Sequence, residues 1–88
     1  MQVENQLERI RTCLLNDFEN DAIEVIYNYN PINRTLFCGV NYPLSELYIV
    51  YNWIVPEENL GDFFNFIYGT IAKDLTNFIK KTAKEYGY

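Results

Sequence analysis

Apolar residues recur with the period of a helix in two segments, one at the start of the chain and one at its end. In residues 3–18 they lie three or four positions apart, at Val3, Leu7, Ile10, Leu14 and Phe18. Such spacing aligns side chains along one face of a helix, so we predict a short amphipathic helix there. After residue 56 the same period continues through Leu60, Phe64, Ile67, Ile71, Leu75, Phe78 and Thr82. This pattern predicts a long second helix that ends at Gly87.

The start and the middle of the long helix carry signals of their own. Pro56, Glu57 and Glu58 favour a helix start, because proline suits the first turn and carboxylates suit the positive end of the helix dipole. Gly61 is compatible with a delay of the regular helix to about Asp62. Gly69 costs about 1 kcal/mol relative to alanine inside a helix. A kink, or a break between two helices, is therefore compatible with the sequence at that position.

Between the two helical segments the pattern changes to the alternation typical of strands. It predicts strands over residues 22–30, 35–41 and 46–55, and the turns between them, 31–34 and 42–45, each contain a proline. Connections this short favour antiparallel pairing of neighbouring strands. We therefore predict an α+β fold with the order α-β-β-β-α. It consists of a three-stranded antiparallel meander packed with one short N-terminal helix and one long C-terminal helix.

The third predicted strand is apolar on both faces, so the second face of the sheet needs an explanation. The helices could lie on opposite faces of the sheet, or a second subunit could cover the remaining face. In the third alternative the face is an exposed interaction surface. That surface would consist of Ile26, Phe37, Tyr48, Val50 and Ile54.

The long helix raises the same question, since Phe63, Phe66 and Tyr68 lie away from its apolar stripe. At about 100° per residue these three side chains cannot all join that stripe. Some of them are therefore exposed, or they contact the first helix or another chain. Alternatively, the helix is more than half buried within its own domain. Exposed aromatic side chains are favourable anchors in protein interfaces.

The composition of the chain argues against catalysis. The chain has no histidine, one serine and two cysteines, Cys13 and Cys38, and it contains no phosphate-binding loop, dinucleotide fingerprint or zinc-ligand spacing. We predict reduced, buried thiols, no cofactor, no metal and no enzymatic activity. The length of 88 residues suits a single compact domain over residues 1–88.

Charge and hydropathy limit the partners. Residues 1–72 hold ten carboxylates against three arginines, whereas residues 73–88 hold four lysines against two carboxylates, and the net charge is -5. The acidic body disfavours direct binding to nucleic acid or to an anionic membrane. No apolar stretch approaches the roughly 20 residues that span a bilayer, and the N-terminus does not read as a signal peptide. We therefore expect a cytoplasmic protein, in the host cytoplasm if it is viral.

Two acidic clusters are the candidate partner-binding residues, together with nearby aromatic anchors. If the meander brings the two clusters together, they form an acidic rim. The clusters are either simply solvated, or they imitate the phosphates of a nucleic acid and occupy a basic channel of a protein partner. The anchors would supply the desolvated contacts. The candidates are Glu19, Asp21, Glu24, Glu57, Glu58, Asp62, Phe63, Phe66 and Tyr48.

In element order and in these two acidic clusters, the chain resembles some phage-encoded anti-CRISPR proteins. That resemblance implies an inhibitor that covers the nucleic-acid site of a nuclease with carboxylates. A toxin antidote of the immunity type would need the same surface. We therefore predict a small acidic inhibitor of one macromolecular partner, for example a nucleic-acid-binding enzyme.

The segment from Leu47 to Tyr86 supports an alternative function. It is a strand followed by Pro-Glu-Glu and a long amphipathic helix, and it is similar to the strand–helix unit of type III secretion chaperones. That resemblance implies an acidic, dimeric protein of the cytosol. The alternative prediction is therefore a homodimeric interaction module.

Overall fold

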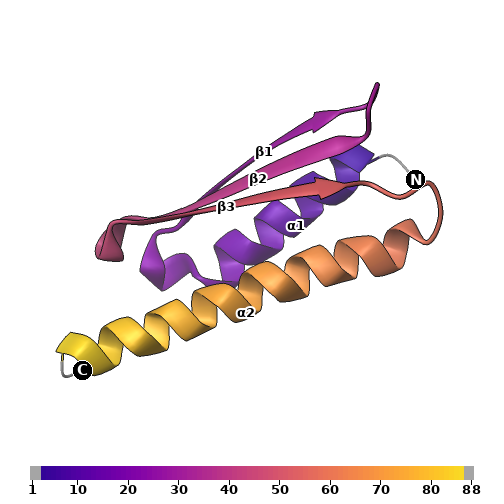
Figure 1. Ribbon diagram of the computed structural model, residues 1–88. Coiled ribbons are helices and arrows are strands. Elements are labelled where there is room, and N and C mark those ends of the chain that lie inside the picture. The colour runs from indigo at the N-terminus through magenta and orange to yellow at the C-terminus, as the bar shows by residue number, and fades with distance from the viewer. Residues whose placement is uncertain (1–2, 87–88) are drawn as a thin grey trace.

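The computed structural model describes residues 3–86, and its elements follow the predicted order α-β-β-β-α (Figure 1). The predicted α+β class and the three-stranded antiparallel sheet are confirmed. Each strand pairs with the next in the chain, giving the order β1-β2-β3. The elements are α1 (Val3–Asp17), the 3₁₀ turn η1 (Glu19–Asp21), β1 (Glu24–Asn30), β2 (Thr35–Tyr42), the 3₁₀ turn η2 (Pro43–Ser45), β3 (Leu47–Ile54) and α2 (Leu60–Tyr86).

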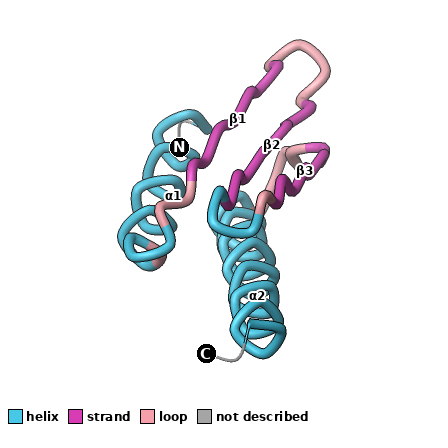
Figure 2. Tube along the Cα trace, turned by 90° about the vertical axis from the view of Figure 1, so that its left-hand side faces the viewer, coloured by secondary structure: helices cyan, strands magenta, loops and turns pink. Residues whose placement is uncertain are grey.

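Both helices pack on the same face of the sheet, so the described residues form two layers (Figures 1 and 2). The alternative that placed the helices on opposite faces is therefore wrong. The helix α1 lies beneath β1, while α2 runs along the sheet beside it. One face of the sheet faces the helices, and the other is left uncovered by them.

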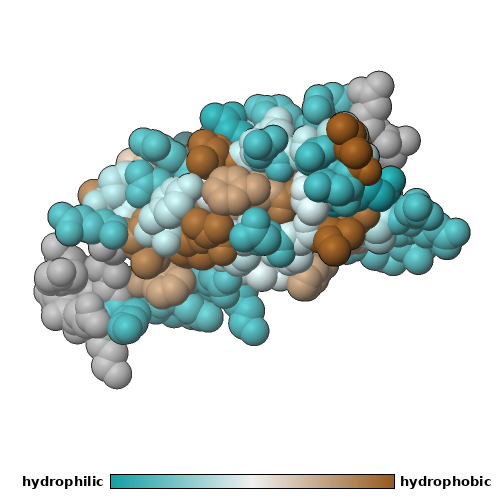
Figure 3. Space-filling view, turned by 45° about the horizontal axis from the view of Figure 1, so that its top comes forward, coloured by the Kyte–Doolittle hydropathy of each residue, from teal (hydrophilic) through white to brown (hydrophobic). Residues whose placement is uncertain are grey.

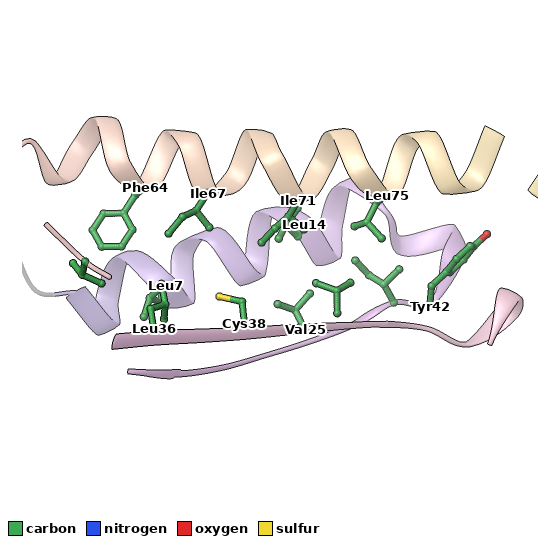
Figure 4. Close-up of a cluster of buried hydrophobic side chains, with 13 residues drawn as sticks. Leu7, Leu14, Val25, Leu36, Cys38, Tyr42, Phe64, Ile67, Ile71 and Leu75 are labelled. Carbon is green, nitrogen blue, oxygen red and sulfur yellow. The ribbon is translucent and has the colours of Figure 1, made fainter. Parts of the chain in front are cut away.

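The core lies between the sheet and the two helices (Figure 4). Leu7 and Leu14 contribute to it from α1, and a stripe along α2 contributes Phe64, Ile67, Ile71 and Leu75. The strand residues buried in the core all point to the same face of the sheet, in keeping with the two-residue period of a strand. They are Val25, Leu36, Cys38, Val40 and Tyr42.

The helix α2 begins four residues later than Pro56 and is continuous from Leu60 to Tyr86. The helix therefore begins between the two predicted positions, after Pro56, Glu57 and Glu58 and before Asp62, because Asn59 adopts a left-handed backbone with φ 58° just before it. Asparagine tolerates that conformation better than most residues. The Asn59 carbonyl then accepts a hydrogen bond from the Phe63 N–H at 3.1 Å. The described helix continues through Gly69 without a break. The predicted end at Gly87 lies outside the described residues.

The connection between β3 and α2 is held by Arg34, which lies in the turn between β1 and β2. Its Nε donates a hydrogen bond to the Val55 carbonyl at 2.8 Å, and its Nη2 donates to the Pro56 carbonyl. In return, the Val55 N–H donates to the Arg34 carbonyl at 2.8 Å. This guanidinium therefore fixes the point at which the chain leaves the sheet and turns toward α2.

Candidate partner-binding surface

The sheet face that the helices leave uncovered, here called the outer face, carries the apolar surface considered from the sequence. Ile26 is 52% exposed, Tyr48 52%, Val50 46% and Ile54 73%, while Phe37 is half-buried. The register places Ile26, Gly39 and Val50 in one row across the three strands. In the single chain, therefore, this face of the sheet is exposed to solvent and is not covered by a helix.

Tyr48 and Gly39 shape the middle of the outer face. A Cβ added to Gly39 would lie 2.4 Å from the Tyr48 hydroxyl oxygen and 3.1 Å from Ile26 Cγ1. The Tyr48 side chain therefore reaches diagonally across the central strand and covers the glycine, which is buried although it lies on the outer face. Diagonal cross-strand contacts of this kind are within reach of aromatic side chains. The Tyr48 ring thus lies over the central strand.

Amide side chains separate the apolar ones on this face, so that brown and teal patches alternate over the sheet in Figure 3. Asn28 and Asn52 flank Phe37 in one row of the register. A hollow of about 220 Å³ opens there, and its lining also includes Asn30 and Thr35. Glu24 is the one charged residue in the three strands. The outer face is therefore close to neutral in a protein whose net charge is -5.

The two acidic clusters lie near opposite ends of the sheet, one in η1 and the start of β1, the other in the β3–α2 connection and the first turn of α2. Glu24 shares a row with Asn41 and Tyr48 at one end, and the β3–α2 connection follows Ile54 at the other. Tyr48 and Ile54 are six residues apart on β3, so at about 3.3 Å per residue the two ends are roughly 20 Å apart. The fold therefore does not join the clusters into a single acidic rim. The first cluster is Glu19, Asp21 and Glu24, and the second is Glu57, Glu58 and Asp62.

Within the clusters, five of the six carboxylates are exposed. Asp21 is half-buried and accepts a long hydrogen bond from the Tyr42 hydroxyl at 3.4 Å. Each end of the sheet therefore presents carboxylates to solvent. Tyr48 lies near the first cluster, and Phe66 lies one helical turn after Asp62 of the second cluster.

The three aromatic residues of α2 have different surroundings. Phe63 packs against the core, with its ring centroid 5.6 Å from that of Phe64. Phe66 is 52% exposed and meets the ring of Trp53 edge-on at 6.4 Å. Trp53 in turn stacks on Tyr51, with centroids 4.9 Å apart and planes 8° from parallel. Tyr68 is half-buried and turns toward α1, where its hydroxyl donates to Asp17.

Trp53 and Tyr51 contact the aromatic residues of α2, although the sequence analysis did not name them as candidates. They are two residues apart on β3 and so lie on one face of the strand, and this spacing could have identified them. With Phe66 they form an aromatic cluster along the β3 side of α2, at the edge of the sheet.

Among the side chains that the structure describes, four tyrosine hydroxyls donate to carboxylates of other elements and so connect those elements. Tyr27 donates to Glu8 at 2.8 Å, between β1 and α1, and Tyr51 donates to Asp74 at 2.5 Å, between β3 and α2. The other two pairs are Tyr42–Asp21 and Tyr68–Asp17. Some of the tyrosines and carboxylates of the chain therefore serve the fold itself.

The two cysteines are free and differ in exposure. Cys38 is buried in the core, and burial raises the pKa of its thiol to about 11, which keeps it protonated and unreactive near neutral pH. Cys13 is exposed, so its predicted burial is wrong. It lines a groove of about 240 Å³ between the helices, together with Arg9, Phe64 and Tyr68.

The described residues offer neither a metal site nor a membrane-spanning helix. In residues 3–86, no cluster of three or more histidine, cysteine or carboxylate side chains is arranged to hold a metal ion. Within the same range, no helix has the length and apolar character needed to cross a bilayer. The chain matches no protein-family model, and comparisons with curated proteins and with solved structures found no match.

Proposed function

We propose that this protein is a non-enzymatic inhibitor that binds one macromolecular partner across the outer face. The observation that carries the proposal is the exposure of Ile26, Tyr48, Val50 and Ile54 on a face that neither helix covers. Ile26, Tyr48 and Val50 gather around Gly39, and exposed apolar side chains that gather in this way favour an interaction site. Tyr48 lies over Gly39 and is 52% exposed, and an exposed aromatic side chain is a favourable anchor in a protein interface.

The charges around the outer face favour a protein partner with basic surface. The near-neutral face is bordered by exposed carboxylates at both ends, roughly one strand length apart. A partner with a neutral contact area between two basic regions would match this arrangement, and nucleic-acid-binding enzymes expose basic regions of that kind. Binding there would exclude the nucleic acid and inhibit the enzyme.

Affinity capture from the native host, with a variant series, tests the proposal. The protein should retain a single stoichiometric partner that high salt releases, because screening weakens the contacts to its carboxylates. Substitution of Ile26→Glu or reversal of Glu57, Glu58 and Asp62 to lysine should abolish capture while circular dichroism remains unchanged. Glu4→Lys is the matched control, since Glu4 is exposed on α1 and belongs to neither acidic cluster.

Two outcomes would contradict the proposal. If reversal of Glu57, Glu58 and Asp62 left capture unchanged, these carboxylates would have no role in binding the partner. Capture that survives Ile26→Glu and Val50→Glu would show that the partner binds elsewhere, and the outer face would then have no role in binding.

A further inference from the structure

The free edge of β3 presents unpaired backbone groups in a defined pattern. The Val55 N–H donates to the Arg34 carbonyl at 2.8 Å and extends the β2–β3 ladder by one residue. Backbone groups alternate in direction along a strand, so the odd-numbered residues of β3 bond to β2. The even-numbered residues therefore direct their N–H and C=O groups to the free edge. They are Tyr48, Val50, Asn52 and Ile54.

This edge lacks the features that usually prevent strand pairing. Between Leu47 and Ile54 there is no proline, glycine or charged residue, and the strand is eight residues long. Natural proteins protect edge strands with such residues or with a covering element. The opposite edge of the sheet is different, because Arg11 on α1 donates from Nε to the Val25 carbonyl at 2.9 Å and Glu24 begins that strand.

We infer that a second copy of this chain pairs antiparallel with β3 and extends the sheet to six strands. This inference does not rest on the proposed function. It leaves the apolar side chains of the outer face open in both copies, and of the acidic residues it leaves Glu19 and Glu24 exposed. The faces of the two sheets must match, since otherwise the helices of the two copies would lie on opposite sides. Only registers that pair even-numbered residues with even-numbered residues satisfy this condition.

One register uses all four outward-directed residues of each copy. It places Val50 opposite the partner's Asn52 and Tyr48 opposite the partner's Ile54, with the two-fold axis at Tyr51. Shifting the strand by two residues leaves Ile54 opposite the partner's Glu46, which lies outside the strand. The register centred on Tyr51 is therefore the one that bonds every group on the edge.

The charges of α2 select a second copy as the occupant of this edge. The contacts of Tyr51 with Asp74 and of Trp53 with Phe66 place the middle of α2, near Thr70, level with the middle of β3. A two-fold axis there sets the two α2 helices antiparallel. At 1.5 Å per residue, Asp62 lies about 12 Å from Thr70 toward one end, and Lys80 lies about 15 Å toward the other.

The acidic start of each α2 therefore lies near the basic end of the other. Glu57, Glu58 and Asp62 of one copy face the partner's Lys80 and the partner's Lys81, all of which are exposed in the single chain. Although a net charge of -5 opposes association, this segregation places opposite charges together at both ends of the interface. The half-exposed cluster of Phe66 and Trp53 lies along the same edge and would be covered.

Light scattering and amide exchange on the pure protein test the inference without any partner. The mass should rise from 10.5 kDa toward twice that value as the concentration passes through the micromolar range. Over the same range, the amide protons of Tyr48, Val50, Asn52 and Ile54 should become protected from exchange. A monomer at every concentration would overturn the inference, and so would a dimer in which these four amides exchange rapidly.

A backbone variant removes one edge donor while it leaves the bonds to β2 intact. The Val50 N–H points to the free edge, so Val50→Pro should weaken self-association by about tenfold or more. Val50→Thr keeps the N–H and the β-branched shape, and it should associate like the original protein. Equal association of both variants, each with a native circular dichroism spectrum, would overturn the register.

A charge-swap pair tests the antiparallel arrangement of α2. A Lys80→Glu, Lys81→Glu variant and a Glu57→Lys, Glu58→Lys, Asp62→Lys variant should each lose self-association, because like charges then meet at both ends. An equimolar mixture of the two should recover a heterodimer, since opposite charges meet again. Failure of the mixture to associate would overturn the antiparallel arrangement.

Discussion

At the scale of single residues, tyrosine hydroxyls paired with carboxylates connect the elements of this fold. Tyr27 bonds to Glu8, Tyr51 to Asp74 and Tyr68 to Asp17, so each helix is tied to another element by at least one such pair. A tyrosine in this setting serves the fold only while its hydroxyl keeps its proton. The stability of the protein should therefore decrease at alkaline pH.

The pKa shifts give that dependence its sign. The hydrogen bond to Asp17 raises the pKa of Tyr68 to about 12, the bond to Glu8 raises the pKa of Tyr27, and burial followed by the Asp74 bond raises the pKa of Tyr51. An unfolded tyrosine titrates near pH 10, so the unfolded state loses protons first. The stabilising contribution should be fully present below about pH 10 and should fall as the pH approaches about 12.

Urea denaturation at about pH 8 and about pH 11 measures this loss. Tyr68→Phe should show a smaller difference between the two pH values than the original protein. Tyr48→Phe, on the outer face, is the matched control and should keep the full difference. An unchanged pH dependence in Tyr68→Phe would show that its pair with Asp17 contributes nothing to alkaline stability.

At the scale of elements, the two glycines Gly39 and Gly69 illustrate opposite constraints. Nothing lies within 4 Å of a Cβ placed on Gly69, which is exposed in the middle of α2. A Cβ on Gly39 would collide with the Tyr48 hydroxyl. The same substitution should therefore have opposite effects in the helix and in the sheet.

Gly69→Ala should raise the free energy of unfolding by about 0.5–1 kcal/mol, since alanine loses less backbone entropy in a helix and meets no neighbour. Gly39→Ala should lower it, because the Tyr48 side chain must leave its place on the central strand. Thermal and urea unfolding of both variants measure the two effects. Destabilisation by Gly69→Ala would contradict the uninterrupted helix.

At the scale of the whole molecule, burial is one-sided, because both helices share one face of the sheet. Ile67 on α2 is fully buried, whereas Ile54 on the outer face is 73% exposed. The two isoleucines thus report on the two sides of the sheet with the same side chain.

Ile67→Ala should lower the free energy of unfolding by about 2–5 kcal/mol, since it removes buried methylene groups and leaves a cavity. Ile54→Ala should change it by no more than about 0.5 kcal/mol. Chemical denaturation at a protein concentration where the chain is monomeric measures both. A large loss from Ile54→Ala under those conditions would mean that the outer face is covered within the single chain.

The sequence by itself determined the elements and their pairing, because these depend on signals that are local in the chain. The helical period from Leu60 to Phe78 and the alternation in β3 are properties of neighbouring residues, and short turns impose antiparallel strands. The separation of the acidic clusters follows from that topology too, since a three-stranded meander puts the start of β1 and the end of β3 at opposite ends.

Only the tertiary structure decided which face of the sheet the helices cover. Both faces of β3 are apolar, so its pattern is compatible with a helix on either side. The choice depends on contacts between distant residues, such as those of Leu14 on α1 and Ile67 on α2 with the same face of β2. The start of α2 was decided in the same way, because the bonds of Arg34 to the carbonyls of Val55 and Pro56 hold that segment out of the helix. Packing between distant segments therefore created the outer face.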